Sequence, residues 1–203
     1  MNRWTTAVAL ALVLPAAAAR ADLIEWSEHW VPSPGTVKVN AAGTSGIILT
    51  GGGTPRIDGS SSIVAANLQT FSNAPANHPV VFSDVPFTLM LFIHDKQFNI
   101  DGAVTFSGFF EGRLSKDSSL LQYDLISPRT QTLHLGHHVY DVTLTNFTPP
   151  GPPRSTSLGG FTAFVRVAHN PEPASLVLAA LAAPLAGLPL LRRRRARAAA
   201  AAR

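Results

Sequence analysis

Histidines, whose imidazoles can bind a metal ion, cluster in one run of the sequence, His134-Leu135-Gly136-His137-His138. Side chains alternate between the two faces of a strand, so the outer two histidines would share a face if the run were one continuous strand. Two imidazoles would need a third ligand from elsewhere in the fold to hold a metal ion, and His94 or Asp95 are the candidates. The alternative is a turn at Gly136 with exposed histidines around it. Because the sequence places no third ligand, we predict neither a metal site nor a cofactor.

The carboxylates are scattered along the chain. Asp95 and Glu111 are candidates for a glycosidase acid pair, but that chemistry needs a separation that only the fold sets. Asp58-Gly59 and Asp101-Gly102 are typical of hairpin turns, in which glycine supplies the positive φ. Neither dipeptide is followed by the alternating oxygen ligands of a calcium loop. We therefore predict no catalytic residue and interpret the chain as a protein that is not an enzyme.

The aromatic residues allow a binding function. Trp26, Trp30 and Tyr140 would stack on sugar rings if they were exposed on one sheet face. The alternative is that they pack in the core. Exposure of these rings would favour a carbohydrate-binding module, whereas converging carboxylates or histidines would favour a secreted hydrolase.

The elements that must position these residues are strands. Short runs rich in β-branched and aromatic residues, bounded by Gly, Pro, Asn and Ser, predict strands at Thr36–Asn40, Gly46–Thr50, Ser62–Leu68, Phe87–Ile93, Ala103–Phe109, Leu120–Ile126, Thr132–Leu135, Val139–Phe147 and Phe161–Val167. The continuous apolar run Phe87–Ile93 predicts a central strand with both faces covered. Tyr140, Val142 and Leu144 fall on one face of their strand.

Turn residues separate these runs, as at Gly51–Gly53 and in the proline-rich stretch Pro149–Ser157, which we expect to form a loop between the last two strands. No stretch before Pro171 shows a sustained helical apolar face. Eight or nine short strands at this spacing predict an all-β domain over residues 22–170, an antiparallel β-sandwich or jelly roll.

The N-terminus is typical of a secretory signal. Residues 1–21 contain Arg3, an apolar run over Ala7–Leu14, and then small residues. Ala19-Arg20-Ala21 fits the small-x-small pattern that signal peptidase cleaves, with a cut after Ala19 as the alternative. We expect export through the secretion machinery and a mature chain that begins at Asp22.

The overall net charge of +4 is misleading for the domain. Half of the basic residues lie in the N-terminal 21 and C-terminal 33 residues, so residues 22–170 carry 8 basic against 11 acidic residues and are mildly acidic. This balance argues against nucleic acid as a partner. The chain has no cysteine, so an exported domain would be held together by its core alone.

The C-terminal segment has three parts in a fixed order. Pro171-Glu172-Pro173-Ala174-Ser175-Leu176 comes first, residues 174–191 carry no charge, and Arg192, Arg193, Arg194 and Arg195 follow. At about 1.5 Å per residue, the uncharged stretch reaches about 27 Å as a helix, close to the bilayer core of about 30 Å. The arginine block is expected to stay in the cytoplasm, which places the domain across the membrane from residues 192–203.

This tail resembles the PEP-CTERM sorting signal of Gram-negative bacteria, which combines a Pro-Glu-Pro motif, an apolar helix and an arginine cluster. The resemblance covers residues 171–203, with the motif at 171–176 and the transmembrane helix at 174–191. It implies recognition of Pro171, Glu172 and Pro173 by an exosortase, a membrane protease that processes the tail.

The resemblance also implies a location. The precursor would be anchored in the inner membrane and the processed protein would reach the cell surface or an extracellular matrix, where polysaccharide is a possible partner. Sequence analysis therefore favours an exported, non-catalytic surface or matrix protein. The alternatives are the carbohydrate-binding module and, less favoured, the secreted hydrolase.

Overall fold

The computed structural model describes residues 23–170, and this part of the chain consists of strands joined by turns and loops. The strands are β1 (Glu25–Ser33), β2 (Thr36–Lys38), β3 (Ser45–Gly51), β4 (Gly53–Asp58), β5 (Ser61–Ser72), β6 (Val80–Asp95), β7 (Ile100–Leu114), β8 (Ser119–Leu125), β9 (Thr130–Leu135), β10 (His138–Thr148) and β11 (Gly159–His169). Between residues 23 and 170 there is no helix, and hence none that is long and apolar enough to cross a membrane. The predicted signal peptide and the predicted sorting segment lie outside the described residues.

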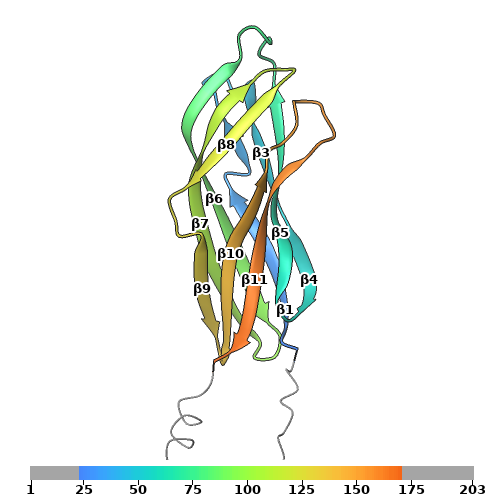
Figure 1. The fold of residues 1–203 in the computed structure, drawn as a ribbon, viewed down its shortest axis with the longest axis vertical. Helices are drawn as coiled ribbons and strands as arrows, with labels where there is room; N and C mark the ends of the chain where they lie inside the picture. The colour runs from blue at the N-terminus through green and yellow to red at the C-terminus, as the bar shows by residue number, and fades with distance from the viewer. Residues whose placement is uncertain (1–22, 171–203) are drawn as a thin grey trace, which may run out of the picture.

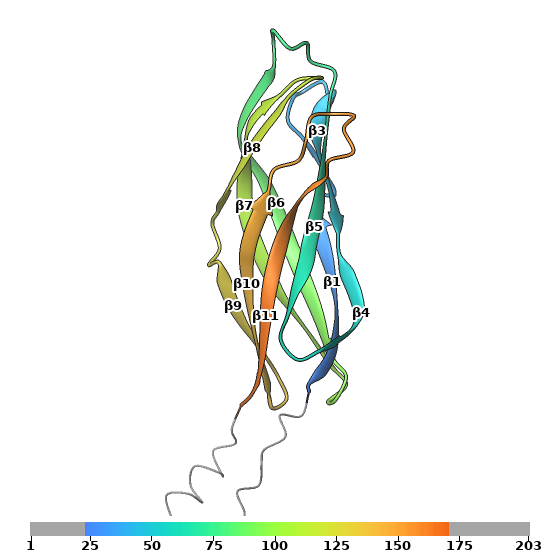
Figure 2. The same ribbon diagram turned by 45° about the vertical axis from the view of Figure 1, so that its right-hand side comes forward.

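The strands form two antiparallel sheets. The first has the order β4-β1-β6-β7-β8, and the second has the order β2-β3-β5-β11-β10-β9. Figures 1 and 2 show the two sheets running along the same long axis and facing each other, as in a β-sandwich. The prediction of an all-β domain is confirmed.

The core lies between the sheets and follows the period of two that strands impose. On β6 the buried apolar side chains in the middle of the strand are Phe87, Leu89, Leu91 and Ile93. On β10 the predicted face of Tyr140, Val142 and Leu144 is buried opposite them. Aromatic rings fill the space between the sheets, where Phe87 stacks on Phe110 with ring centroids 4.3 Å apart and on Phe161 with centroids 5.4 Å apart.

The apolar run in β6 is central, as predicted, because β6 pairs with β1 on one edge and β7 on the other. The predicted coverage of both faces is only half right. Met90 and Phe92 point away from the core and are half-buried by neighbouring side chains of their own sheet.

All nine predicted strands are present, with shifted ends, and two strands were missed. β1 was missed because Glu28 and Pro32 interrupt its apolar pattern. β4 was missed because Gly53, Pro55 and Arg56 are typical of loops. Proline is tolerated in β4 because this strand lies at the edge of its sheet.

The three glycines at 51–53 carry the chain from the second sheet to the first, between β3 and β4. Gly52 joins the two sheets, because its N–H donates to Ala65 O at 3.3 Å and its carbonyl accepts from Trp30 N–H at 2.8 Å. A Cβ at Gly52 would collide with the backbone of Val64, so the close approach requires glycine.

The two predicted hairpin turns are corrected by the structure. Asp58-Gly59 is a turn and Gly59 has a φ of +69°, but it links β4 of one sheet to β5 of the other. Asp101-Gly102 lies inside β7, paired with Ile93 and His94 of β6. The turn between β6 and β7 comes earlier, and Asn99, with a φ of 53°, takes the left-handed conformation there.

Both ends of the described chain lie at the same end of the sandwich (Figures 1 and 2). Near the first residues, Ile24 O accepts from Gly59 N–H at 2.8 Å, and Glu25 O accepts from Lys96 N–H at 3.1 Å. At the other terminus, Asn170 N–H donates to His137 O at 2.7 Å. We call this end of the sandwich the base.

Candidate functional site

The base contains a buried polar network centred on Asp95, the last residue of β6. His138 Nδ1 lies 2.5 Å from Asp95 Oδ2, and the Tyr140 hydroxyl donates to the same oxygen at 2.8 Å. The backbone N–H groups of Gln97 and Phe98 donate to Asp95 Oδ1 at 3.0 and 3.1 Å. The network therefore ties β6 of the first sheet to β10 of the second.

The protonation of this network follows from its hydrogen bonds. Burial would raise the pKa of Asp95, but the hydrogen bonds from His138, Phe98 N–H and Tyr140 outweigh burial and lower it. Burial, and then the hydrogen bond to Asp95, raise the pKa of the Tyr140 hydroxyl far above its usual range. Asp95 is thus a carboxylate, and Tyr140 stays protonated as its donor.

The network is sealed from solvent. Asp95, His138 and Tyr140 are each 0 % exposed. A carboxylate only accepts hydrogen bonds, so His138 Nδ1 carries a proton and donates it. Its other nitrogen, Nε2, has no hydrogen-bond partner among the described residues and lies in an aromatic surrounding, with the rings of Phe98 and His169 centred 4.8 and 4.7 Å from its own. The enclosed network links the two sheets through hydrogen bonds between β6 and β10.

For the histidine run the structure has the turn at Gly136 that was the alternative to one continuous strand, but His138 is buried and not exposed. The chain turns back at Gly136, which has a φ of +58°, so the run is not one strand and its outer histidines do not share a face. His134 ends up opposite Val139, and His138 points into the core. Asp95 does reach His138, but within residues 23–170 no group of three His, Cys, Asp or Glu side chains is placed to hold a metal ion.

The structure does not bring the candidate pair Asp95 and Glu111 together. Asp95 points inward at the base, whereas Glu111 lies on the outer face, eleven residues along β7 from Ile100, the partner of Asp95. At about 3.3 Å per residue this places them about 36 Å apart, much farther than the roughly 5–10 Å of a glycosidase pair.

The aromatic residues considered for stacking on sugars are core residues, which was the alternative in the sequence. Trp26 is 0 % exposed, Trp30 is 4 % and Tyr140 is 0 %. Trp26 Nε1–H donates to Gly59 O at 2.8 Å, and its ring meets the edge of Tyr140. These three rings therefore offer no surface to a glycan.

Glu28 is a second buried carboxyl group, and sequence analysis did not single it out. It is 6 % exposed and points inward from β1, between Trp26 and Trp30, because all three pair with inward residues of β6. Neither carboxylate oxygen has a hydrogen bond of normal geometry among the described residues. Burial raises the pKa of Glu28, and the nearby hydroxyl and N–H of Thr54 lower it by less.

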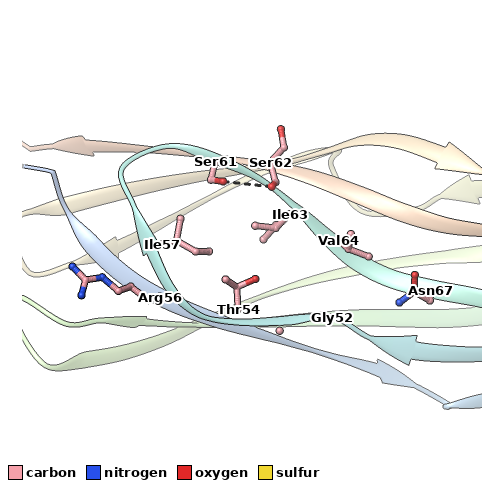
Figure 3. A pocket seen from close by; sticks show the side chains of 10 residues that line it. Gly52, Thr54, Arg56, Ile57, Ser61, Ser62, Ile63, Val64 and Asn67 are labelled. Carbon is pink, nitrogen blue, oxygen red and sulfur yellow. Dashed lines mark hydrogen bonds between the residues drawn. The ribbon is translucent and has the colours of Figure 1, made fainter.

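A pocket of about 530 Å³ opens at the side of the sandwich, where β4 and β5 run beside each other (Figure 3). Ile57 and Ile63 point into this lateral pocket, and Thr54 lies between them, as Figure 3 shows. Arg56 points away from it toward Glu25 and Asp58, at 3.3 and 3.8 Å. The lateral pocket offers apolar and hydroxyl groups, but the guanidinium of its one ionisable lining residue is already paired.

A second pocket, of about 430 Å³, lies on the outer face of the first sheet. Its outward-facing lining residues come from four strands and are Ser27 and His29 of β1, Pro55 of β4, Phe92 and His94 of β6, and Asp101 of β7. We call it the outer pocket. The rings of His29 and Phe92 stack at 4.8 Å, and His94 Nδ1 lies 2.8 Å from Asp101 Oδ1.

Sequence analysis did not predict the outer pocket. The register of β1 on β6 places Ser27 opposite His94 and His29 opposite Phe92, and β6 places Asp101 opposite His94. β1 was not among the predicted strands. The sequence signal that could have indicated β1, and with it the outer pocket, was the alternation along this strand, where Ser27, His29 and Val31 face outward at every second position.

Comparisons with known proteins identify no family. No protein-family model matches the sequence. No curated protein and no solved structure matches the chain either.

The predicted addressing residues lie outside residues 23–170, namely Ala19, Ala21, Pro171, Glu172, Pro173, Arg192, Arg193, Arg194 and Arg195. They stay predictions of the sequence. The structure describes the domain that these segments flank.

Proposed function

We propose that this chain is an exported, non-catalytic protein of the cell surface or extracellular matrix, sorted by an exosortase-type membrane protease. In this proposal a signal peptide over residues 1–21 directs export, and a transmembrane helix at 174–191 holds the precursor in the inner membrane. The observation that carries the proposal is the order of the C-terminal parts: Pro171-Glu172-Pro173, an uncharged stretch, and Arg192–Arg195.

The geometry of the base supports this arrangement. Both ends of the described chain lie at the same end of the elongated sandwich (Figure 1). A domain that is anchored in the bilayer through its C-terminal segment can then stand end-on, with its long axis directed away from the bilayer. The Asp95 network and the hydrogen bond from Asn170 brace the strands at the base.

The chemistry of the domain supports a non-catalytic role. Within residues 23–170, the one buried contact between a carboxylate and an imidazole joins Asp95 to His138, and it is enclosed and already used by neighbouring donors. The candidate pair of Asp95 and Glu111 is about 36 Å apart by strand length. The mildly acidic balance of residues 22–170 supports partners other than nucleic acid.

Substitution of the central motif residue tests the proposal. Glu172→Ala is expected to block processing, so that the precursor accumulates in the membrane fraction with its tail attached. The readout is the amount of full-length chain in membranes and of shortened chain at the surface. Glu111→Ala, the same change at an exposed glutamate of the domain, is the matched control and is expected to mature as the wild type does. Normal maturation of Glu172→Ala would mean that the motif is not what the protease reads.

A further inference from the structure

We propose that the outer pocket binds a sugar unit of a neutral polysaccharide. The inference rests on the proposed function for where the ligand is met, since a protein in an extracellular matrix is surrounded by glycan. The pocket itself is argued from its own side chains. It differs from the sugar site considered in the sequence, because none of Trp26, Trp30 and Tyr140 takes part.

The first observation is an apolar wall of the outer pocket, formed by the rings of His29, Phe92 and Pro55. His29 and Phe92 are cross-strand partners on the outer face, and their rings stack with centroids 4.8 Å apart and only 7° between planes. Pro55 adds a further ring from β4. Stacked rings in fixed register lose little conformational freedom on binding and offer C–H and π surface, against which the apolar side of a sugar ring packs.

The second observation is an oriented polar pair beside this wall. His94 Nδ1 donates to Asp101 Oδ1 at 2.8 Å, because a carboxylate can only accept. The second ring nitrogen of His94, Nε2, is a further hydrogen-bonding atom of this pair. The Asp101 side chain is 82 % exposed, so its remaining acceptor sites are open to a ligand. A carboxylate and an imidazole close together match hydroxyl groups on adjacent carbons of a sugar, because a hydroxyl both donates and accepts.

Charge decides which sugars fit. No lysine or arginine lines the outer pocket, and Asp101 supplies a negative charge within it. Uronate, sulfate or phosphate groups would be repelled there. The volume of about 430 Å³ is in the usual range for small-ligand sites, about 300–1,000 Å³. A neutral hexose or N-acetylhexosamine unit combines the apolar ring face and the hydroxyl donors that the pocket matches.

The lateral pocket lacks this combination. Its lining has hydroxyl and aliphatic groups but no aromatic ring, imidazole or carboxylate. It therefore serves as an internal comparison: substitutions there are expected to leave glycan binding unchanged.

The test is a glycan array probed with the whole protein. The array carries neutral hexose and N-acetylhexosamine oligosaccharides beside uronate- and sulfate-bearing ones. Wild-type protein is expected to bind neutral glycans, and Asp101→Ala is expected to weaken that binding by at least about tenfold, as loss of hydrogen bonds to a charged group does. Asp124→Ala, at an exposed aspartate on β8 of the same sheet, and Ser62→Ala in the lateral pocket are the controls and should bind as wild type does.

A second variant removes part of the wall. His29 is exposed, so His29→Ala should leave the fold intact, which circular dichroism can verify, and should weaken neutral-glycan binding in the same direction. The proposal is overturned if the wild type binds no glycan, binds only acidic glycans, or binds neutral glycans as tightly when Asp101 is replaced. Such a result would leave export and tail processing untouched, because those are measured by the location and mass of the chain.

Discussion

Asp95→Ala is expected to destabilise the domain by about 3–5 kcal/mol, the cost of breaking a buried charged hydrogen-bond network by removing one partner. The change leaves His138 Nδ1–H, the Tyr140 hydroxyl and the backbone N–H groups of Gln97 and Phe98 without their acceptor. The side chains of Asp95, His138 and Tyr140 are 0 % exposed, so water does not replace the bonds from His138 and Tyr140. Urea unfolding followed by tryptophan fluorescence measures the loss, since Trp26 and Trp30 are buried.

The pH dependence of this effect has a defined sign. Because the folded state lowers the pKa of Asp95, its contribution is complete above the unfolded pKa, near 3.8, and is lost as the pH falls through the folded pKa. The difference between wild type and Asp95→Ala should therefore be constant from neutral pH down to about pH 4 and shrink below it. Asp124→Ala, at an exposed site, is the control, with an expected change within about 0.5 kcal/mol. An equally small effect of Asp95→Ala would show that the network does not hold the sheets together.

Glu28→Met is expected to do the opposite and stabilise the domain by about 1–3 kcal/mol at neutral pH. The reason is that a buried carboxylate without good partners costs about this much, and an unbranched apolar side chain removes the cost. Glu28 lies among core residues and is 6 % exposed, so the methionine side chain has apolar neighbours. The same urea unfolding experiment, at neutral pH, measures the gain.

The pH dependence of this gain in stability also has a defined sign. The folded state raises the pKa of Glu28, so the folded chain binds more protons and the wild type loses stability as the pH rises above the unfolded value of 4.5. The advantage of Glu28→Met should therefore be smallest in acid and grow toward neutral pH. Glu111→Met, at an exposed position, should show neither the gain nor its pH dependence. Destabilisation by Glu28→Met at neutral pH would mean that the carboxylate has a favourable role in the folded protein.

The strands were predictable where the side-chain pattern was simple. The run Phe87–Ile93 marks a central strand, the alternation of Tyr140, Val142 and Leu144 reflects burial directly, and both strands are present. β1 could not be predicted with the same rule, because a buried Glu28 interrupts its apolar face. The assignment of turns failed at Asp101-Gly102 for a tertiary reason. Leu133 and Leu135 of the opposite sheet pack where a side chain at Gly102 would be.

Contacts between residues that are far apart in the chain could not be predicted from the sequence. Asp95 was a candidate partner of the histidine run, and the structure does bring it to His138, but as an enclosed pair and not as a metal ligand set. The outer pocket depends on the register between β1 and β6, which neighbouring residues in the sequence do not encode. The C-terminal segment could be interpreted from the sequence alone, because its motif, uncharged stretch and arginines follow one another along the chain.

The intact mass of the protein recovered from the cell surface or medium tests the central claim most directly. The account predicts a chain that starts at Asp22 and ends near Pro171–Ala174, with any group added by the protease. That result would establish both export and processing of the tail. A membrane-bound chain that keeps residues 171–203 would contradict the account and leave the C-terminal segment as a plain membrane anchor.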